Sequence, residues 1–157
     1  MQPLYRGNIL TVYDREGYDV VSVADACAIL PLRVSTDGVE VLLVEQFRVA
    51  PDRRLWEIPA GRIDAGESPH QCAQRELAEE TGYQASQWTA LGGFYTAPGF
   101  STEYLHVFLA RDLNTLDDPV EGDEDDLRLR WWPLKAIESE DAKTLAALHL
   151  WSQWSER

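Results

Sequence analysis

Three glutamates in the segment RELAEE, residues 75–80, are spaced to lie on one side of a helix. Because successive residues of a helix are about 100° apart, Glu76, Glu79 and Glu80 fall within an arc of about 100°. Like charges at these spacings oppose helix formation by roughly a few tenths of a kcal/mol per pair. A hard divalent cation such as Mg²⁺ removes this repulsion, since it binds carboxylate oxygens and substrate phosphates together. The pattern therefore indicates a metal site, and an ordinary solvated acidic face is the alternative.

The residues that flank this motif complete a longer pattern with fixed spacing. Gly61 is followed after five residues by Glu67, after seven more by Arg75 and Glu76, and then by the string LAEETGY, which ends at Tyr83. All fixed letters of the Nudix box, G-x5-E-x7-R-E-U-x-E-E-x-G-U with U a bulky apolar residue, are present, although Tyr83 is aromatic where an aliphatic residue is commoner. Within this pattern we expect Glu67 to hold Arg75 in an ion pair that braces the loop against the helix. The chain resembles the Nudix hydrolases, and the resemblance implies an αβα sandwich.

Turn and cap residues predict how this segment folds. Gly61 and Gly66 flank a loop that must turn tightly, and glycine adopts unusual backbone angles at the least cost. Ser68 is the expected N-cap of a helix that begins at Pro69 and stops at Gly82. The segment is therefore expected to form a loop, about four turns of helix and a second loop.

Composition limits the class of protein. The 157 residues, 45% apolar and 26% charged, correspond to one soluble globular domain. The net charge of −13 argues against nonspecific binding to nucleic acid or to an anionic membrane, which requires a basic patch. No apolar run approaches the roughly 18 residues of a transmembrane helix, and the first residues, MQPLYRGNIL, do not resemble a signal peptide. With Cys27 and Cys72 as the two cysteines and no CxxC motif, we expect reduced, packed thiols in a cytoplasmic protein.

Apolar segments of strand length alternate with two helical segments. We expect strands at Asn8–Tyr13, Asp19–Val23, Ala24–Val34, Val39–Val44, Leu55–Ile58, Trp88–Tyr95, Tyr104–Ala110 and Leu127–Trp132, and a second helix at Ala142–Trp154. This order indicates an α/β (α+β) fold in which helices cover a mixed central sheet, preceded by an N-terminal β-hairpin. We place the hairpin, as a dimer-forming unit, in residues 1–23 and the Nudix domain in residues 24–157. The apolar residues of the second helix that are expected to face the core are Leu145, Leu148, Trp151 and Trp154.

Three strings beside the box are similar to those of the ADP-ribose pyrophosphatase branch of the family. They are LLVEQFR at residues 42–48, LWEIPAG at 55–61 and YTAPGFSTE at 95–103, with Pro98 fifteen residues after Tyr83. The resemblance implies Mg²⁺-dependent cleavage of ADP-ribose to AMP and ribose 5-phosphate. Another nucleoside diphosphate sugar is an alternative substrate, and a sensing module that has lost catalysis is an alternative from a different class. The intact box favours the enzyme.

The resemblance also implies roles for individual residues. Glu76 and Glu80 are direct metal ligands together with the backbone carbonyl of Ala60, and Glu79 holds a further ion or its water in the catalytic centre. The cofactor is Mg²⁺, or Mn²⁺ in its place, with two or three ions per site. The residues assigned to the substrate are Arg48, Glu57, Pro98, Glu103 and Tyr18. The guanidinium fork of Arg48 suits a phosphate, and a surface ion pair is the alternative.

Carboxylates bound to a metal are poor proton acceptors, so the catalytic base is expected elsewhere. The resemblance implies a glutamate from the loop before the final strand, which in this chain is the acidic segment Asp117–Asp126. Glu124 is the first choice, since it lies three residues before the strand that begins at Leu127. A base must come within about 2.6–3.2 Å of the attacking water, which favours the glutamate nearer an anchored element. Glu121 and Glu103 are the reserves, and a solvated loop is the alternative for the segment.

A homodimer is expected from the same resemblance. N-terminal strands exchange between subunits in that branch, and aromatic residues of the partner help to clamp adenine. Tyr5, Tyr13 and Tyr18 are candidates for this stacking, and half-buried tyrosines on a hairpin are the alternative.

Overall fold

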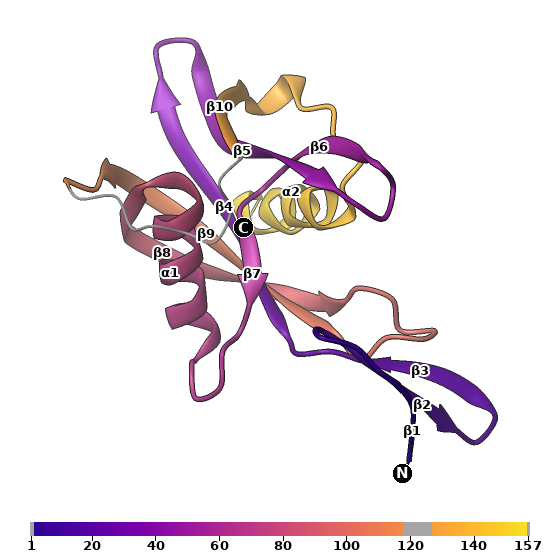
Figure 1. Cartoon of the computed structure of the whole chain (residues 1–157). Coiled ribbons are helices and arrows are strands. Elements are labelled where there is room, and N and C mark those ends of the chain that lie inside the picture. Colours follow the sequence, from indigo (N-terminus) through magenta and orange to yellow (C-terminus); the bar gives the residue numbers. More distant parts are fainter. Residues whose placement is uncertain (1, 118–126, 157) are drawn as a thin grey trace.

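A mixed seven-stranded sheet forms the centre of the protein (Figure 1). The computed structural model describes residues 2–117 and 127–156. The strands are β4 (Ala26–Ser35), β5 (Gly38–Arg48), β6 (Arg53–Glu57), β7 (Ala60–Arg62), β8 (Tyr83–Tyr95), β9 (Tyr104–Thr115) and β10 (Arg128–Pro133). They lie in the order β10-β5-β4-β9-β8, while β6 pairs with β5 and β7 pairs with β4. Among these described strands β4 and β9 run parallel and the other pairs are antiparallel, so the expected mixed sheet is confirmed.

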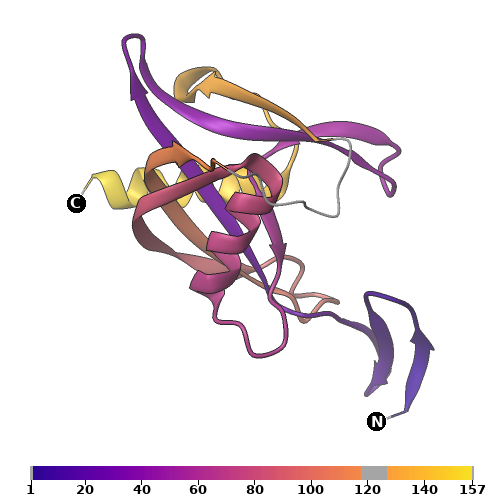
Figure 2. The same cartoon turned by 60° about the vertical axis from the view of Figure 1, so that its left-hand side comes forward.

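The two α-helices cover opposite faces of this sheet (Figure 2). They are α1 (Pro69–Thr81) and α2 (Ala142–Ser155), and a short 3-10 helix, η1 (Leu134–Ala136), precedes α2. Successive side chains of a strand point to opposite faces of a sheet, so β4 supplies both cores, with Cys27 on the α1 side and Ala28 on the α2 side. This arrangement is the αβα sandwich that the sequence predicts. Within the described ranges, no helix is long and apolar enough to span a membrane.

The helix of the box begins and ends where the sequence predicts. The Ser68 hydroxyl accepts a hydrogen bond from the Gln71 N–H at 3.2 Å, and the Gln71 side chain accepts one from the Ser68 N–H at 2.9 Å. Gly82 ends the helix with a φ of 68°, and Gly66 turns the preceding loop with a φ of 86°, both in the left-handed region that favours glycine. Gly61 does not have a positive φ, so the expectation of an unusual backbone angle is wrong there.

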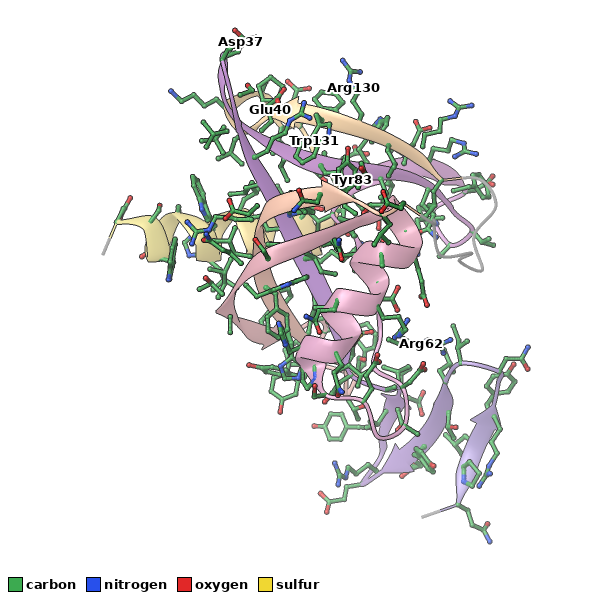
Figure 3. All side chains as sticks on the ribbon, turned by 90° about the vertical axis from the view of Figure 1, so that its left-hand side faces the viewer. Asp37, Glu40, Arg62, Tyr83, Arg130 and Trp131 are labelled. Carbon is green, nitrogen blue, oxygen red and sulfur yellow. The ribbon has the colours of Figure 1, made fainter. Side chains whose placement is uncertain are left out.

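Strand β8 begins at Tyr83, directly after the helix, so the expected second loop is absent and the strand starts earlier than expected. The left-handed Gly82 reverses the chain straight into the sheet. The Tyr83 ring packs edge-to-face against Trp131 of β10, with ring centroids 5.9 Å apart (Figure 3). The guanidinium of Arg33 also lies 4.0 Å from the centroid of the Trp131 ring. The aromatic residue at this box position therefore has a packing partner on the edge strand.

The N-terminal segment forms a three-stranded antiparallel sheet rather than the expected two-stranded hairpin. Its strands are β1 (Pro3–Arg6), β2 (Thr11–Arg15) and β3 (Tyr18–Ser22). The sequence gives no signal for β1, because three of its four residues are exposed and no apolar alternation marks it. The sheet projects from the body (Figure 2) and joins it through β3, where the Val21 N–H donates to the Phe100 carbonyl at 2.7 Å and the Thr102 N–H donates to the Val21 carbonyl at 3.0 Å.

The face by which α2 packs on the sheet differs in part from the expected one. Two of the four apolar residues do pack against the core, but Leu145 is 50% exposed and Trp154 is 37% exposed. Thr144 and Ala147 are instead completely buried. Because Thr144 and Ala147 are small, this side of the helix can approach the sheet closely. Leu145 and Trp154 lie on other sides of the helix and are partly exposed to solvent.

Candidate active site

A polar pocket of about 550 Å³ lies where the box meets the sheet. The described residues that line the pocket come from β5, β7, the loop after β7, α1 and the position directly before β10. They are Arg48, Ala60, Gly61, Arg62, Asp64, Arg75, Glu76, Glu79, Glu80 and Leu127. Three arginines and four carboxylates of the described part of the chain therefore share one cavity. The structure brings together the box glutamates, Ala60 and Arg48, as the sequence predicts.

Arg75 organises the carboxylates of α1. Its Nη1 donates to Glu76 Oε1 at 2.7 Å and to Glu79 Oε2 at 3.0 Å. Its Nε and Nη2 donate to the two oxygens of Glu67 at 3.0 and 2.9 Å, and Nη2 also donates to the Arg62 carbonyl at 3.0 Å. The expected Glu67–Arg75 brace is confirmed, and Arg75 also orients two of the predicted metal ligands.

Two of the glutamates bound to Arg75, Glu76 and Glu67, have opposite pKa shifts. Burial raises the pKa of Glu76 above its usual range, and this effect outweighs the hydrogen bond from Arg75. Hydrogen bonds from Arg75 lower the pKa of Glu67, because they stabilise its charged form. Glu67 is therefore held in its charged form by Arg75. The charged form of Glu76 is disfavoured by burial, and a further cation close to it would stabilise that form.

Glu76 and Glu80 both reach the short strand β7. The Ala60 N–H donates to Glu80 Oε2 at 3.0 Å, which ties the carboxylate to the backbone of the predicted ligand residue. A Cβ atom added to Gly61 would lie 1.8 Å from Glu76 Oε1, 1.9 Å from its Cδ and 2.3 Å from its Oε2. Gly61 is therefore required because a side chain there would occupy the place of the Glu76 carboxylate.

A buried pair of thiols lies beneath β7. Cys27 of β4 and Cys72 of α1 are both free and fully buried, with their sulfurs 2.7 Å apart. The hydrogen bond to Cys72 and burial raise the pKa of the Cys27 thiol. The expected reduced and packed cysteines are confirmed, and they hold the first turns of α1 against the sheet.

The donor chemistry of the pocket fits a hard divalent ion. Glu76, Glu79, Glu80 and Asp64 offer carboxylate oxygens to one cavity, and Ala60 contributes a backbone carbonyl nearby. Within the described residues, no three Asp, Glu, His or Cys side chains are already drawn together as a ligand cluster. The physical reason is that Arg75 stands between Glu76 and Glu79 and binds both.

Arg48 lines the pocket and forms a two-pronged ion pair with Glu57. Its Nε donates to Glu57 Oε1 at 2.9 Å, and its Nη2 donates to Oε2 at 2.6 Å. The Glu57 side chain is 2% exposed and is not among the described residues that line the cavity. Burial would raise the pKa of Glu57, but the hydrogen bonds from Arg48 and the charge of Lys143 outweigh it and lower this pKa. Glu57 therefore contacts the pocket indirectly, by binding Arg48, which lines it.

The other residues assigned to the substrate lie apart from this pocket. Pro98 is exposed in the turn between β8 and β9, where the Phe100 and Ser101 N–H groups both donate to the Ala97 carbonyl. Glu103 is half-buried at the end of the same turn. Tyr18 is 69% exposed on β3. A second hollow of about 280 Å³ lies between that sheet and the turn, lined by Tyr13, Arg15, Val20, Ser22 and Thr102.

Two predicted residues lie outside the described part of the chain, and three residues at or near the site were not predicted. Glu121 and Glu124, the candidates for the base, lie outside the described residues. Arg62 and Asp64 line the pocket but occupy variable letters of the box, so their positions carried no signal. Lys143 holds Glu57 from 86 residues away, and nothing in the sequence links the two.

Comparison with known proteins identifies the class. Residues 24–151 match the family model for the NUDIX domain, so the chain belongs to the Nudix family. It is 44% identical over 108 residues to an ADP-ribose pyrophosphatase of Bacillus subtilis (strain 168), a match that covers 69% of this chain and 57% of that protein. It is 43% identical over 118 residues to an ADP-ribose pyrophosphatase of Mycobacterium tuberculosis (strain ATCC 25618 / H37Rv), which covers 74% of this chain and 56% of that protein.

A solved structure agrees with the sandwich over its whole length. The crystal structure of an ADP compounds hydrolase superposes with a TM-score of 0.78 and 26% identity, and the match covers 99% of this chain and 91% of that one. The matched regions of the two curated relatives make up less than two thirds of their lengths. These comparisons therefore show the family and the fold.

Proposed function

We propose that this protein hydrolyses the pyrophosphate of ADP-ribose to AMP and ribose 5-phosphate. The observation that carries the proposal is that three box glutamates, Glu76, Glu79 and Glu80, line the same pocket as Arg48, Arg62 and Arg75. Carboxylates alone would repel a diphosphate, whereas guanidinium groups beside them supply positive charge and hydrogen-bond donors for phosphate oxygens. The names of the two curated relatives support the choice of substrate.

The proposed cofactor is Mg²⁺, or Mn²⁺ in its place, with two or three ions per site. Glu76, Glu80 and the Ala60 carbonyl would hold the ions directly, and Glu79 would hold a further ion or its water. Such ions neutralise phosphate charge and lower the pKa of a bound water. The carboxylate and carbonyl oxygens that the described lining residues offer support this assignment.

The protein's own side chains bind the substrate, orient the metal ligands and accept a proton from the attacking water. Arg48 binds a phosphate oxygen, and Arg75 keeps Glu76 and Glu79 oriented on the pocket side of α1. Water adds to one phosphorus, and the bond from that phosphorus to the bridging oxygen breaks. The proton of the water passes to Glu124, the proposed base, with Glu121 and Glu103 as the alternatives. Replacement of Glu124 by Gln should lower kcat by about a hundredfold, within the range for loss of a general base.

The test is direct chromatography of the products. Purified protein is incubated with ADP-ribose and MgCl₂, and AMP and ribose 5-phosphate are separated and quantified. Equal amounts of the two products, formed with Mg²⁺ and not with EDTA, are the expected result. A panel containing ADP-glucose and GDP-mannose identifies another nucleoside diphosphate sugar as the preferred substrate. Binding of ADP-ribose by calorimetry without turnover of any compound in the panel would instead identify a sensing module.

We further propose that residues 1–23 form a dimer contact beside the Nudix domain of residues 24–157. Large apolar side chains support this proposal, because Leu4, Tyr5, Ile9 and Tyr18 of this segment are each at least 60% exposed. In the dimer, Tyr18 would lie close to the adenine of a substrate bound by the partner. Light scattering at micromolar concentration should give twice the 17.8 kDa chain mass, and the monomer mass would contradict a shared site. The two free thiols support a reducing compartment such as the cytoplasm.

A further inference from the structure

A buried cluster of charges lies behind Arg48, on the side away from the pocket. Lys143 of α2 donates through Nζ to Glu57 Oε2, the oxygen that also accepts from Arg48 Nη2. Lys143 also donates to Asp141 Oδ1 at 3.0 Å, and its side chain is 14% exposed. Two cations and two anions therefore form a connected chain from the start of α2 to Arg48.

The first turn of α2 and the segment just before it hold three consecutive residues, the last two of β6 and the residue that follows it. The Ser139 hydroxyl donates to the Trp56 carbonyl at 3.0 Å. Lys143 holds the side chain of Glu57, and the Thr144 hydroxyl accepts from the Ile58 N–H at 2.9 Å. The backbone contacts fix the strand itself. Lys143, in contrast, fixes the charged side chain of Glu57, which binds Arg48.

Charge balance gives Lys143 a role beyond packing. In the intact cluster, Arg48 and Lys143 balance Glu57 and Asp141. Without Lys143, Glu57 would keep one cationic partner, Asp141 would lose its own, and the group would carry a net negative charge. Among the residues that the structure describes, the adjoining pocket already presents four carboxylates to three arginines. An added negative charge behind Arg48 would weaken the attraction of the pocket for a diphosphate, since electrostatic effects are strong where water is excluded.

We propose that Lys143 is a positioning residue for substrate binding. By sharing the Glu57 carboxylate, it keeps both Glu57 oxygens directed at the Arg48 fork and offsets the negative charge behind that fork. Lys143 is not among the described residues that line the cavity, so it acts on the substrate through Glu57 and Arg48. This inference rests on the proposed function in one respect, which is that the substrate is a diphosphate.

Steady-state kinetics of three variants test the inference. Lys143→Met removes the charge and keeps much of the side-chain volume, while Lys143→Arg keeps the charge. Lys135→Met is the matched control, because Lys135 is the other lysine of the chain and is exposed. For ADP-ribose, we expect Lys143→Met to raise KM by about tenfold or more with kcat changed by less than about threefold, as for loss of ground-state binding. Lys143→Arg should restore KM to within about threefold, and Lys135→Met should behave as wild type.

The outcomes separate the inference from the proposed function. If wild-type protein does not cleave ADP-ribose, the proposed function is wrong. If wild type is active and folded Lys143→Met keeps the wild-type KM, the positioning role is overturned and Lys143 is only structural. A rise in KM for Lys143→Met that Lys143→Arg does not reverse would also overturn the charge argument.

A measurement on the wild-type protein covers the case in which Lys143→Met does not fold. Protein labelled with ¹³C-lysine gives one Cε signal for each of its two lysines, and Lys135→Met assigns them. The probe is α,β-methylene-ADP-ribose, which cannot be cleaved at the pyrophosphate, added in the presence of Mg²⁺. We expect the Lys143 signal to shift in a saturable manner while the Lys135 signal stays in place. An unchanged Lys143 signal at saturation would overturn the inference.

Discussion

Replacement of Gly61 by alanine should impair catalysis far more than stability. The new Cβ would lie 1.8 Å from Glu76 Oε1 and 1.9 Å from its Cδ. Because non-bonded carbon atoms pack at about 3.5 Å, the carboxylate must retreat by roughly 1.5 Å. It is the far end of a flexible side chain, so it can move without unfolding the helix. A displacement of about 1 Å in a reacting constellation costs on the order of a hundredfold in rate, and we expect at least that loss in kcat for ADP-ribose.

Gly66→Ala is the matched control for this substitution. Nothing lies within 4 Å of a Cβ at Gly66, but its φ of 86° is costly for alanine. We expect Gly66→Ala to lower the free energy of unfolding by about 1 kcal/mol with most of the activity kept, the reverse of the Gly61 pattern. Steady-state kinetics at saturating Mg²⁺ and urea denaturation of both variants make the comparison. Wild-type kcat in Gly61→Ala would refute the reasoning that links Gly61 to the position of Glu76.

Three further predictions concern the metal site, the buried charge and the aromatic contact. Glu80→Gln should lower kcat by about a hundredfold or more with the fold kept, and near-normal turnover at saturating Mg²⁺ would contradict the role of Glu80 as a ligand. Glu57→Gln should lower the free energy of unfolding at pH 7 by about 3 kcal/mol, because it removes the buried carboxylate that Arg48 and Lys143 share. The pKa of Glu57 is lowered in the folded protein. The contribution of the Glu57 carboxylate to the free energy of unfolding is therefore fully present above the unfolded pKa of about 4.3 and is lost as the pH falls through the folded pKa. Urea denaturation should accordingly show a smaller difference in stability between Glu57→Gln and wild type near pH 3. Tyr83→Leu should cost about 1 kcal/mol through the lost contact with Trp131 and leave kcat/KM unchanged; a fall in kcat/KM with stability kept would contradict this packing role.

The parts of the site that the sequence predicts are those fixed by local geometry. The cap at Ser68, the stop at Gly82 and the common face of the box glutamates all follow from helix geometry within one short segment. The ion pair of Glu67 with Arg75 follows from the same segment. The αβα sandwich could also be predicted, because strand-length and helix-length apolar segments alternate along the chain.

The parts that could not be predicted depend on contacts between distant segments. The place of Lys143 behind Glu57 requires α2 to pack on the strand before β7, and no periodicity encodes that choice. The exposed Leu145 shows the same limit, since apolar spacing alone did not reveal which side of α2 fits the sheet. Gly61 was interpreted as a turn residue, whereas the structure shows that the space it leaves is filled by Glu76.

The parallel pairing of β4 with β9 has a consequence for folding during synthesis. Ala26 pairs with Leu105, so the central strand β4, whose other partners β5 and β7 follow it closely in the chain, cannot pair with β9 until most of the chain has left the ribosome. Contacts between such distant segments form slowly, because chain entropy is lost before the contact is made. α2 emerges later still, and its Thr144 holds the Ile58 N–H beside the pocket. The helix of the box can form early from local contacts, but a nascent chain would acquire a working pocket only in the last stage of its synthesis.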